Sequence, residues 1–144
     1  MRPIWKQLPR ENSARGSWAA LYVTMKPNGE IVMSRVTWER LGGPAAFHIL
    51  FDEANNRIGL KPTVLQMRDA YKACVKGRRG GRSVNAYRLT QDYNIRLTYT
   101  IQFHDAEIDH DGILILDLRT AHISQRSANH PRNRKKKETS ERAE

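Results

Sequence analysis

Apolar and polar side chains alternate near the start of the chain in a pattern that predicts a β-hairpin. Leu21, Val23 and Met25 are apolar at every second position, which is the period of a strand with one buried face. The sequence PNG at 27–29 favours a reverse turn, because asparagine and glycine tolerate the backbone angles that tight turns require. The segment 30–33, EIVM, is again mostly apolar. We therefore expect two antiparallel strands joined at residues 27–29.

A short helix and a second hairpin are predicted to follow. Ser34 is a candidate N-cap, because its hydroxyl can accept a hydrogen bond from an amide in the first helical turn. Gly42 suits the left-handed position that ends a helix. The remaining predicted elements are a strand with apolar residues at Phe47, Ile49 and Phe51, a turn at 52–56, and a return strand from 57 to 60 that ends before Pro62.

The same order of elements occurs a second time in the chain. The first unit covers about residues 20–62 and the second about residues 69–119. In the second unit Asn85 takes the cap position and Asn94 stands where Gly42 stood, since asparagine tolerates left-handed geometry better than most residues. Tyr99, Ile101 and Phe103 match the alternating residues of the first unit, and the last hairpin turns at 109–112 and returns over 113–118. The repeat is one of pattern and not of identity, so chance similarity is the alternative.

A duplicated unit of this size predicts one mainly β domain with short helices. A four-stranded unit of about 45 residues buries too little apolar surface to be stable alone, so two such units should share a pseudo-twofold core. The single cysteine, Cys74, is most simply a small core residue of the second unit. One cysteine also excludes an intramolecular disulfide, which fits a reducing compartment.

The net charge of +10 is unevenly distributed along the chain. Residues 1–18 hold four basic and one acidic side chain, and residues 126–144 hold seven basic and three acidic ones, which leaves only +3 for residues 19–125. The segment from Ser127 onward has no aromatic or branched aliphatic residue whose burial could offset the conformational entropy lost on folding. We therefore expect a flexible arm at 1–18, a two-repeat domain at 19–125 and a disordered basic tail at 126–144.

The stretch 29–42, GEIVMSRVTWERLG, resembles the hairpin-to-helix signature of the AbrB/MazE/MraZ swapped-hairpin group. In that signature a strand that begins at glycine runs into a short helix closed by Leu-Gly, and the likeness continues more loosely to Pro62. In that family two units interlock into a small β-barrel that binds DNA, in transcription regulators or in the DNA-binding part of antitoxins. The resemblance implies a pseudo-twofold double swapped-hairpin β-barrel with DNA as its partner. It also allows homo-oligomers, because some two-unit relatives form rings.

The chain departs from the family pattern at several positions. Glu30 stands where the family often has arginine, Ser34 where proline commonly opens the helix, and Trp38 and Glu39 where regulators often have basic residues. Each carboxylate would repel phosphate. The resemblance thus supports the fold more strongly than any particular DNA contact.

The best candidate for a binding surface is the glycine- and arginine-rich turn of the second unit, KGRRGGR at 76–82. Glycines let backbone amides approach a phosphate, while arginine guanidinium groups bind its oxygens in pairs. The equivalent turn of the first unit, PNG, carries no charge, which suggests that one half binds and the other mainly builds the fold. The alternative is a solvated hairpin tip without a ligand. The predicted nucleic-acid-binding residues are Lys76, Arg78, Arg79, Arg82 and Arg88, together with Arg134, Lys135, Lys136 and Lys137 of the tail.

The function predicted from these features is DNA binding, as a transcriptional regulator of the bacterial type, with no catalysed reaction and no cofactor. The alternative is a protein-interaction or antitoxin-like module of the same fold that does not touch DNA, with Glu30 and Glu39 marking a surface turned away from nucleic acid. The longest apolar run is ILIL at 113–116, far short of the roughly 20 residues that a membrane helix needs. With no signal-peptide pattern at the N-terminus, we expect a cytoplasmic, nucleoid-associated protein without a membrane partner.

A metal site is the remaining chemical alternative. His104, Asp105, Asp109, His110 and Asp111 supply five possible ligands within eight residues. Alternate residues of a hairpin point to opposite faces, however, and Asp-His-Asp-Gly is ordinary turn chemistry. We therefore predict no metal, and the lack of a nucleophile and general base nearby argues against a hydrolase.

Overall fold

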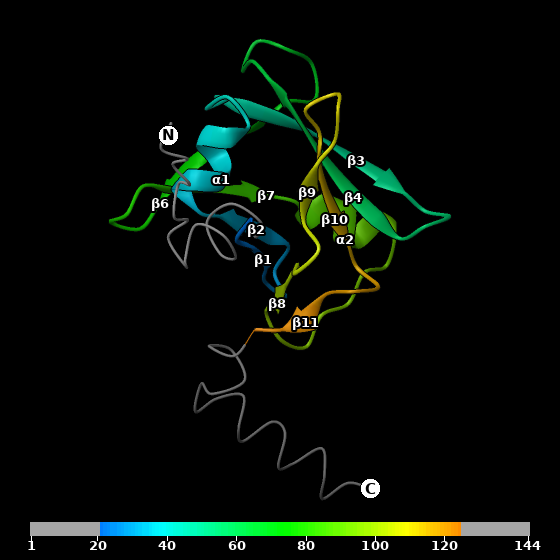
Figure 1. The fold of residues 1–144 in the computed structure, drawn as a ribbon. Helices are drawn as coiled ribbons and strands as arrows, with labels where there is room; N and C mark the ends of the chain where they lie inside the picture. Colours follow the sequence, from blue (N-terminus) through cyan, green and yellow to red (C-terminus); the bar gives the residue numbers. More distant parts are fainter. Residues whose placement is uncertain (1–20, 125–144) are drawn as a thin grey trace, which may run out of the picture.

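Two antiparallel sheets and two short helices make up residues 21–124, the part of the chain that the computed structural model describes. The protein is mainly β, with an α+β composition as the sequence predicts (Figure 1). Sheet A contains, in spatial order, β11 (His122–Ile123), β8 (Ile101–Gln102), β1 (Val23–Met25), β2 (Glu30–Met33), β7 (Gly81–Asn85) and β6 (Cys74–Lys76). Sheet B contains β5 (Tyr71–Lys72), β3 (Ala46–Asp52), β4 (Arg57–Thr63), β10 (Leu114–Asp117) and β9 (Glu107–Ile108).

Local sequence signals account for the first hairpin and its helix. Strands β1 and β2 pair through Val23 and Met33 at one end and Met25 and Ile31 at the other, so the predicted hairpin is confirmed. Helix α1 (Arg35–Arg40) begins after Ser34, whose hydroxyl oxygen accepts a hydrogen bond from the amide of Thr37 at 3.2 Å. The second helix, α2 (Tyr87–Asp92), begins after Ala86, which makes no side-chain cap hydrogen bond, so the prediction of Asn85 at the cap position is wrong by one residue. The Asn85 side chain nevertheless accepts a hydrogen bond from the amide of Tyr87. Gly42 and Asn94, just after the helices, both have positive φ as the repeat predicts.

In each sheet a strand of the first unit pairs directly with a strand of the second. In sheet A, β2 of the first unit pairs with β7 of the second, with Ile31 opposite Val84. In sheet B, β4 pairs with β10, with Leu60 opposite Leu114 and Ile58 opposite Leu116. The two units therefore do not fold as separate halves, because each sheet is completed by strands of both.

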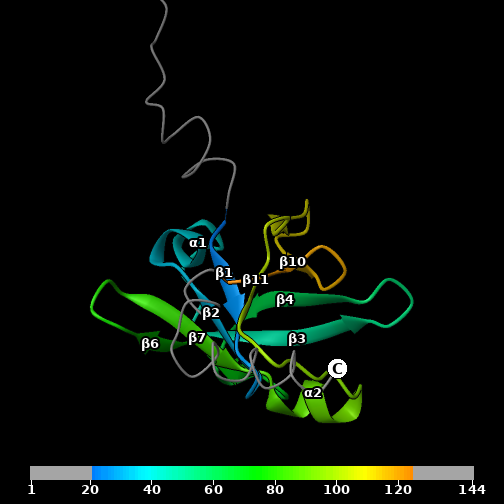
Figure 2. The same cartoon turned by 90° about the horizontal axis from the view of Figure 1, so that it is seen from below.

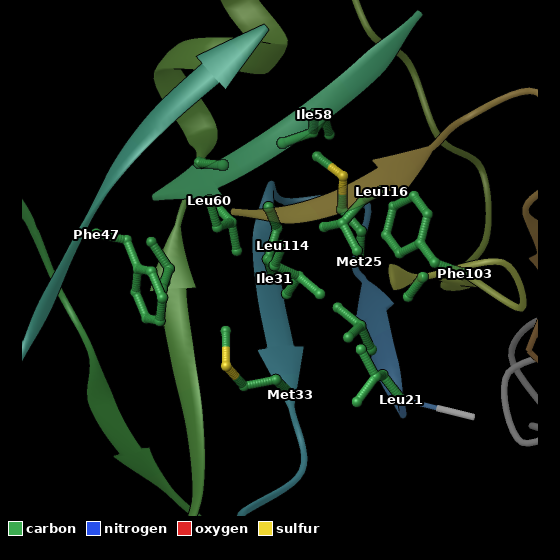
Figure 3. Packing of buried hydrophobic residues seen from close by; sticks show 14 of the residues in the cluster. Leu21, Met25, Ile31, Met33, Phe47, Ile58, Leu60, Phe103, Leu114 and Leu116 are labelled. Carbon is green, nitrogen blue, oxygen red and sulfur yellow. The ribbon is translucent and has the colours of Figure 1, made fainter. Parts of the chain in front are cut away.

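The hydrophobic core lies between the two sheets. Ile58 and Leu60 on β4 and Leu114 and Leu116 on β10 are fully buried, and they point toward the apolar side chains of sheet A (Figure 3). Phe47 and Phe103, one from each unit, are buried in the same cluster. Sheet A contributes Val23, Met25, Ile31, Met33 and Val84 to the core, and Leu21, just before β1, joins them.

Two segments of the second unit pass from one sheet to the other. Strands β5 and β6 are separated only by Ala73, yet β5 pairs with β3 in sheet B and β6 pairs with β7 in sheet A. Strand β8 pairs with β1 in sheet A, and the chain then turns at 103–106 into β9, which pairs with β10 in sheet B. The hydrogen-bonded strands form two open sheets and not one closed barrel within the described residues.

Two expectations for the second unit are wrong in detail. The alternation at Tyr99, Ile101 and Phe103 does not form a long strand matching β3, because only Ile101–Gln102 is extended and the chain leaves sheet A at Phe103. The strand that pairs with β10 is instead Glu107–Ile108. Cys74 is also not in the core: it is exposed on β6, the edge strand of sheet A.

No helix among residues 21–124 is long and apolar enough to cross a membrane. The predicted arm at 1–18 and tail at 126–144 lie outside the described residues.

Candidate nucleic-acid interface

The glycine- and arginine-rich turn forms the tip of the β6–β7 hairpin. Strands β6 and β7 pair from Cys74 and Ser83 to Lys76 and Gly81, and the four residues between Lys76 and Gly81 make the turn. Figure 2 shows this hairpin extending from the body in the direction opposite to the β3–β4 hairpin. Residues 76–79 at the tip are all exposed within the described domain, as a surface that receives a large ligand requires.

Arg78 and Arg79 are exposed cations at the tip of this turn. Both residues are exposed, and the structure gives neither side chain an ion pair or hydrogen bond to another residue of the described range 21–124. Gly77 and Gly80, which flank them, have φ of 75° and 79°. The two guanidinium groups thus keep their full hydrogen-bonding capacity for an external anion.

Lys76 is committed to an ion pair inside the protein. Its Nζ lies 3.0 Å from Oε1 of Glu30, and the same oxygen lies 3.1 Å from Nζ of Lys26. Burial raises the pKa of the Glu30 carboxyl, but hydrogen bonds from Lys76 and Lys26 outweigh it and hold the pKa below its ordinary value. Glu30 is therefore an ionised carboxylate paired with two lysines. It does not add an unpaired negative charge to the surface.

Arg82 is held against helix α1. Its guanidinium carbon lies 3.8 Å from the centroid of the Trp38 ring, an arrangement in which the cation and the ring attract each other. Its Nη1 donates hydrogen bonds to the carbonyl oxygens of Gly80 and Gly81. Trp38 is fixed in turn, because its Nε1 donates to the carbonyl of Pro44 at 2.8 Å. Arg82 therefore joins the turn to the helix.

Arg35 belongs to the same end of the molecule, although sequence analysis did not select it. It is the first residue of α1, and a Cβ placed on Gly80 would lie 3.2 Å from its Cδ. Its Nε contacts Oε1 of Glu39 at 2.7 Å, and both side chains are well exposed. No local sequence signal could have found this contact, because 45 residues separate Arg35 from Gly80.

Arg88 lies apart from this cluster. It is on α2, which begins beyond the end of β7 opposite to the turn, and its Nε contacts Asp92 at 3.7 Å. Figure 2 shows α2 and the β6–β7 tip at different ends of the body. The predicted tail residues Arg134, Lys135, Lys136 and Lys137 lie outside the described residues. Of the nine predicted residues the structure brings together Lys76, Arg78, Arg79 and Arg82, and it adds Arg35.

The acidic turn of the last hairpin serves the backbone. Oδ1 of Asp109 accepts hydrogen bonds from the amides of Asp111 and Ile113, both at 2.9 Å. Within residues 21–124, no three histidine, cysteine, aspartate or glutamate side chains gather in a group that could hold a metal ion. Asp109 is thus accounted for by its role in the turn.

The chain matches no family model, no curated protein and no solved structure.

Proposed function

We propose that this protein binds DNA and acts as a transcriptional regulator, with the β6–β7 turn as its phosphate-binding surface. The observation that carries the proposal is the pair Arg78 and Arg79, exposed and unengaged within the described domain, on a turn flanked by glycines. Guanidinium groups in such a position can form paired, charge-assisted hydrogen bonds with phosphate oxygens. The net charge of +10 adds long-range attraction for a polyanion.

The strand pairing supports the proposed kinship with the swapped-hairpin group. In both sheets a pair of neighbouring strands joins the two units, β2 with β7 and β4 with β10. The segments β5–β6 and β8–β9 connect the two sheets. We propose that the domain is a two-unit, pseudo-twofold swapped-hairpin body, with its barrel interrupted where these two segments bend. The first unit then mainly builds the fold, since its turn at 27–29 carries no charge.

The test is fluorescence anisotropy with a labelled mixed-sequence duplex, measured over a range of salt concentrations. We expect binding that weakens with salt, and a double variant Arg78→Ala/Arg79→Ala that lowers the slope of log affinity against log salt by about 1.8, or about 0.9 for each lost phosphate contact. Lys61→Ala, which removes an exposed cation from β4, is the control and should leave the slope unchanged. Absence of duplex binding at low salt would disprove the proposed function.

The protein-interaction alternative makes an opposite prediction. It requires a stoichiometric protein partner that stays bound after nuclease treatment. Exposed apolar side chains on the loop after β4, at Val64, Leu65 and Met67, are the observation that favours such a contact. Retention of a partner by the Arg78→Ala/Arg79→Ala variant, without any nucleic-acid binding by the wild type, would support this alternative.

A further inference from the structure

Each hairpin turn packs against the helix of the other unit. At Gly29, in the first turn, a Cβ would lie 2.7 Å from Cα of Tyr87, the first residue of α2. At Gly80, in the second turn, a Cβ would lie 3.2 Å from Cδ of Arg35, the first residue of α1. Both glycines have positive φ. The domain thus has two corresponding ends, which we call the α1 pole (α1 with residues 76–82) and the α2 pole (α2 with residues 26–30).

The two poles carry matched ion pairs on their helices. Arg35 and Glu39 lie four residues apart on α1 and contact each other at 2.7 Å. Arg88 and Asp92 have the same spacing on α2, one position further along that helix, and contact each other at 3.7 Å. The difference between the poles is in the turns, since Arg78, Arg79 and Arg82 stand at the α1 pole while the α2 pole has Pro27-Asn28-Gly29. The α2 pole therefore serves as an internal control for any role of helix α1 in binding.

We propose that the α1 pole as a whole is the nucleic-acid surface: Arg35 provides a further phosphate contact beside Arg78 and Arg79, Arg82 positions the turn, and Glu39 limits the affinity. This inference rests on the proposed function and extends it to a second structural element. The contact of Gly80 with Arg35 places the helix beside the turn. A polyanion that reaches the turn therefore meets α1 as well.

Arg35 can exchange its partner because its present ion pair is weak. Exposed ion pairs contribute little to stability, and the Arg35 and Glu39 side chains are 63% and 50% exposed. A phosphodiester of the duplex offers the guanidinium two oxygens, as a carboxylate does, and the neighbouring phosphates, at about one charge per 1.7 Å of helix axis, add to the attraction. Glu39 would then lie beside the bound phosphate and repel it, so the same residue competes for Arg35 and opposes the ligand.

Arg82 differs from the other arginines of the turn because its guanidinium group is already engaged. It lies on the Trp38 ring and donates to two backbone carbonyls of the turn itself. These contacts link the path of residues 80–82 to helix α1. Arg82 thus sets the orientation of Arg78 and Arg79 relative to Arg35 without binding the phosphate.

The decisive experiment compares Glu39→Gln with Asp92→Asn in the full chain, using the same duplex and salt series. Glu39→Gln should bind about threefold or more tightly at low salt, with the gain shrinking as salt rises. Asp92→Asn, the matched change at the α2 pole, should stay close to the wild type. A gain of affinity cannot come from unfolding, so loss of structure cannot imitate the expected result. Equal effects of both variants, or tighter binding by Asp92→Asn alone, would overturn the inference.

Two further variants separate contact from positioning. Arg35→Ala should lower the salt slope by about 0.9, as expected for one lost phosphate contact. Arg82→Met, which keeps an unbranched side chain able to cover Trp38, should weaken binding without changing the slope. It should also alter the fluorescence of Trp38, recorded with Trp5 and Trp18 replaced by phenylalanine, before any nucleic acid is added. An unchanged slope for Arg35→Ala, or a slope reduced by Arg82→Met, would contradict the assigned roles.

The outcomes distinguish this inference from the function on which it rests. If the wild type binds no duplex at low salt, the proposed function fails and the composite surface fails with it. If the wild type binds and Arg78→Ala/Arg79→Ala lowers the slope, but neither Glu39→Gln nor Arg35→Ala has an effect, the function stands and the role of α1 is rejected.

Discussion

Glu30 and Lys76 form an ion pair that connects the hairpins of the two units, with 3.0 Å between Oε1 and Nζ. Strand β7 lies between the strands that carry them, so the lysine side chain crosses β7 to reach the carboxylate. Lys26 binds the same oxygen at 3.1 Å from within the first hairpin. One partly buried carboxylate therefore contacts two lysines at once and offsets one of their two charges.

Replacing Glu30 by glutamine should destabilise the protein in a pH-dependent way. The folded protein holds the pKa of this carboxyl below its ordinary value of 4.5, so its contribution is present above that pH and is lost as pH falls through the lower folded pKa. We expect Glu30→Gln to lower the free energy of unfolding by about 1 kcal/mol at pH 7, because two cations lose their partner while remaining partly solvated. Urea denaturation at pH 7 and pH 3 should show the difference shrinking at the lower pH. If the free energies of unfolding of the variant and the wild type differed equally at both pH values, the loss of stability could not be assigned to the charge of Glu30.

Glycine-to-alanine substitutions test how the turns pack on the helices. Gly29→Ala places a methyl group 2.7 Å from backbone of Tyr87, whereas Gly77→Ala meets nothing within 4 Å. Both glycines have positive φ, so Gly77→Ala measures the backbone cost alone, about 1 kcal/mol. Gly29→Ala should cost about 2 kcal/mol more, since α2 must shift to admit the methyl group. Thermal or urea unfolding of both variants checks this, and equal losses would show that the first turn does not press on α2.

The local elements of the first unit could be predicted because their signals lie within a few residues of one another. Ser34 and Thr37 are three positions apart, and the turn at 27–29 is determined by its own residues. The left-handed backbone at Asn94 followed from the same local chemistry. These predictions concern hydrogen bonds between near neighbours, which sequence patterns describe well.

The contacts that define the candidate site could not be predicted in this way. The pairing of β2 with β7 and the position of Arg35 beside Gly80 join residues about 50 positions apart, and many registers satisfy the same alternation of apolar residues. The alternation of apolar residues from Tyr99 to Phe103 predicted a long strand that does not form, and the reason is related. Phe103 is buried at the point where the chain turns from sheet A toward sheet B, so an apolar side chain was needed there without a strand.

The turn between β3 and β4 is stabilised by one carboxylate whose protonation can be followed directly. Asn55 donates from Nδ2 at 2.8 Å to Asp52, Arg57 donates from Nη2 at 2.9 Å, and the amide of Asn55 donates at 3.2 Å. In this order these bonds lower the pKa of Asp52 to about 2. Asn55→Ala removes the first donor and should raise the pKa of Asp52 toward its ordinary value of 3.8, as followed by an NMR titration of its side-chain carboxyl carbon. An unchanged pKa would show that the Asn55 side chain does not bind the carboxylate in solution.

Cys74 provides a direct test of where the second hairpin lies. A core cysteine would react with a thiol reagent only when the protein unfolds, whereas Cys74 is exposed on the edge strand β6 together with Val75 and Lys76. We therefore expect the native protein to react with an aromatic disulfide reagent at a rate within about tenfold of the urea-unfolded chain, because access does not require opening of the structure. Val84→Cys in a Cys74→Ser background is the matched control, since Val84 is fully buried on the neighbouring strand β7. Slow reaction of Cys74 and of the control alike would mean that β6 is covered in solution, and the exposed hairpin on which the proposed DNA contact depends would be wrong.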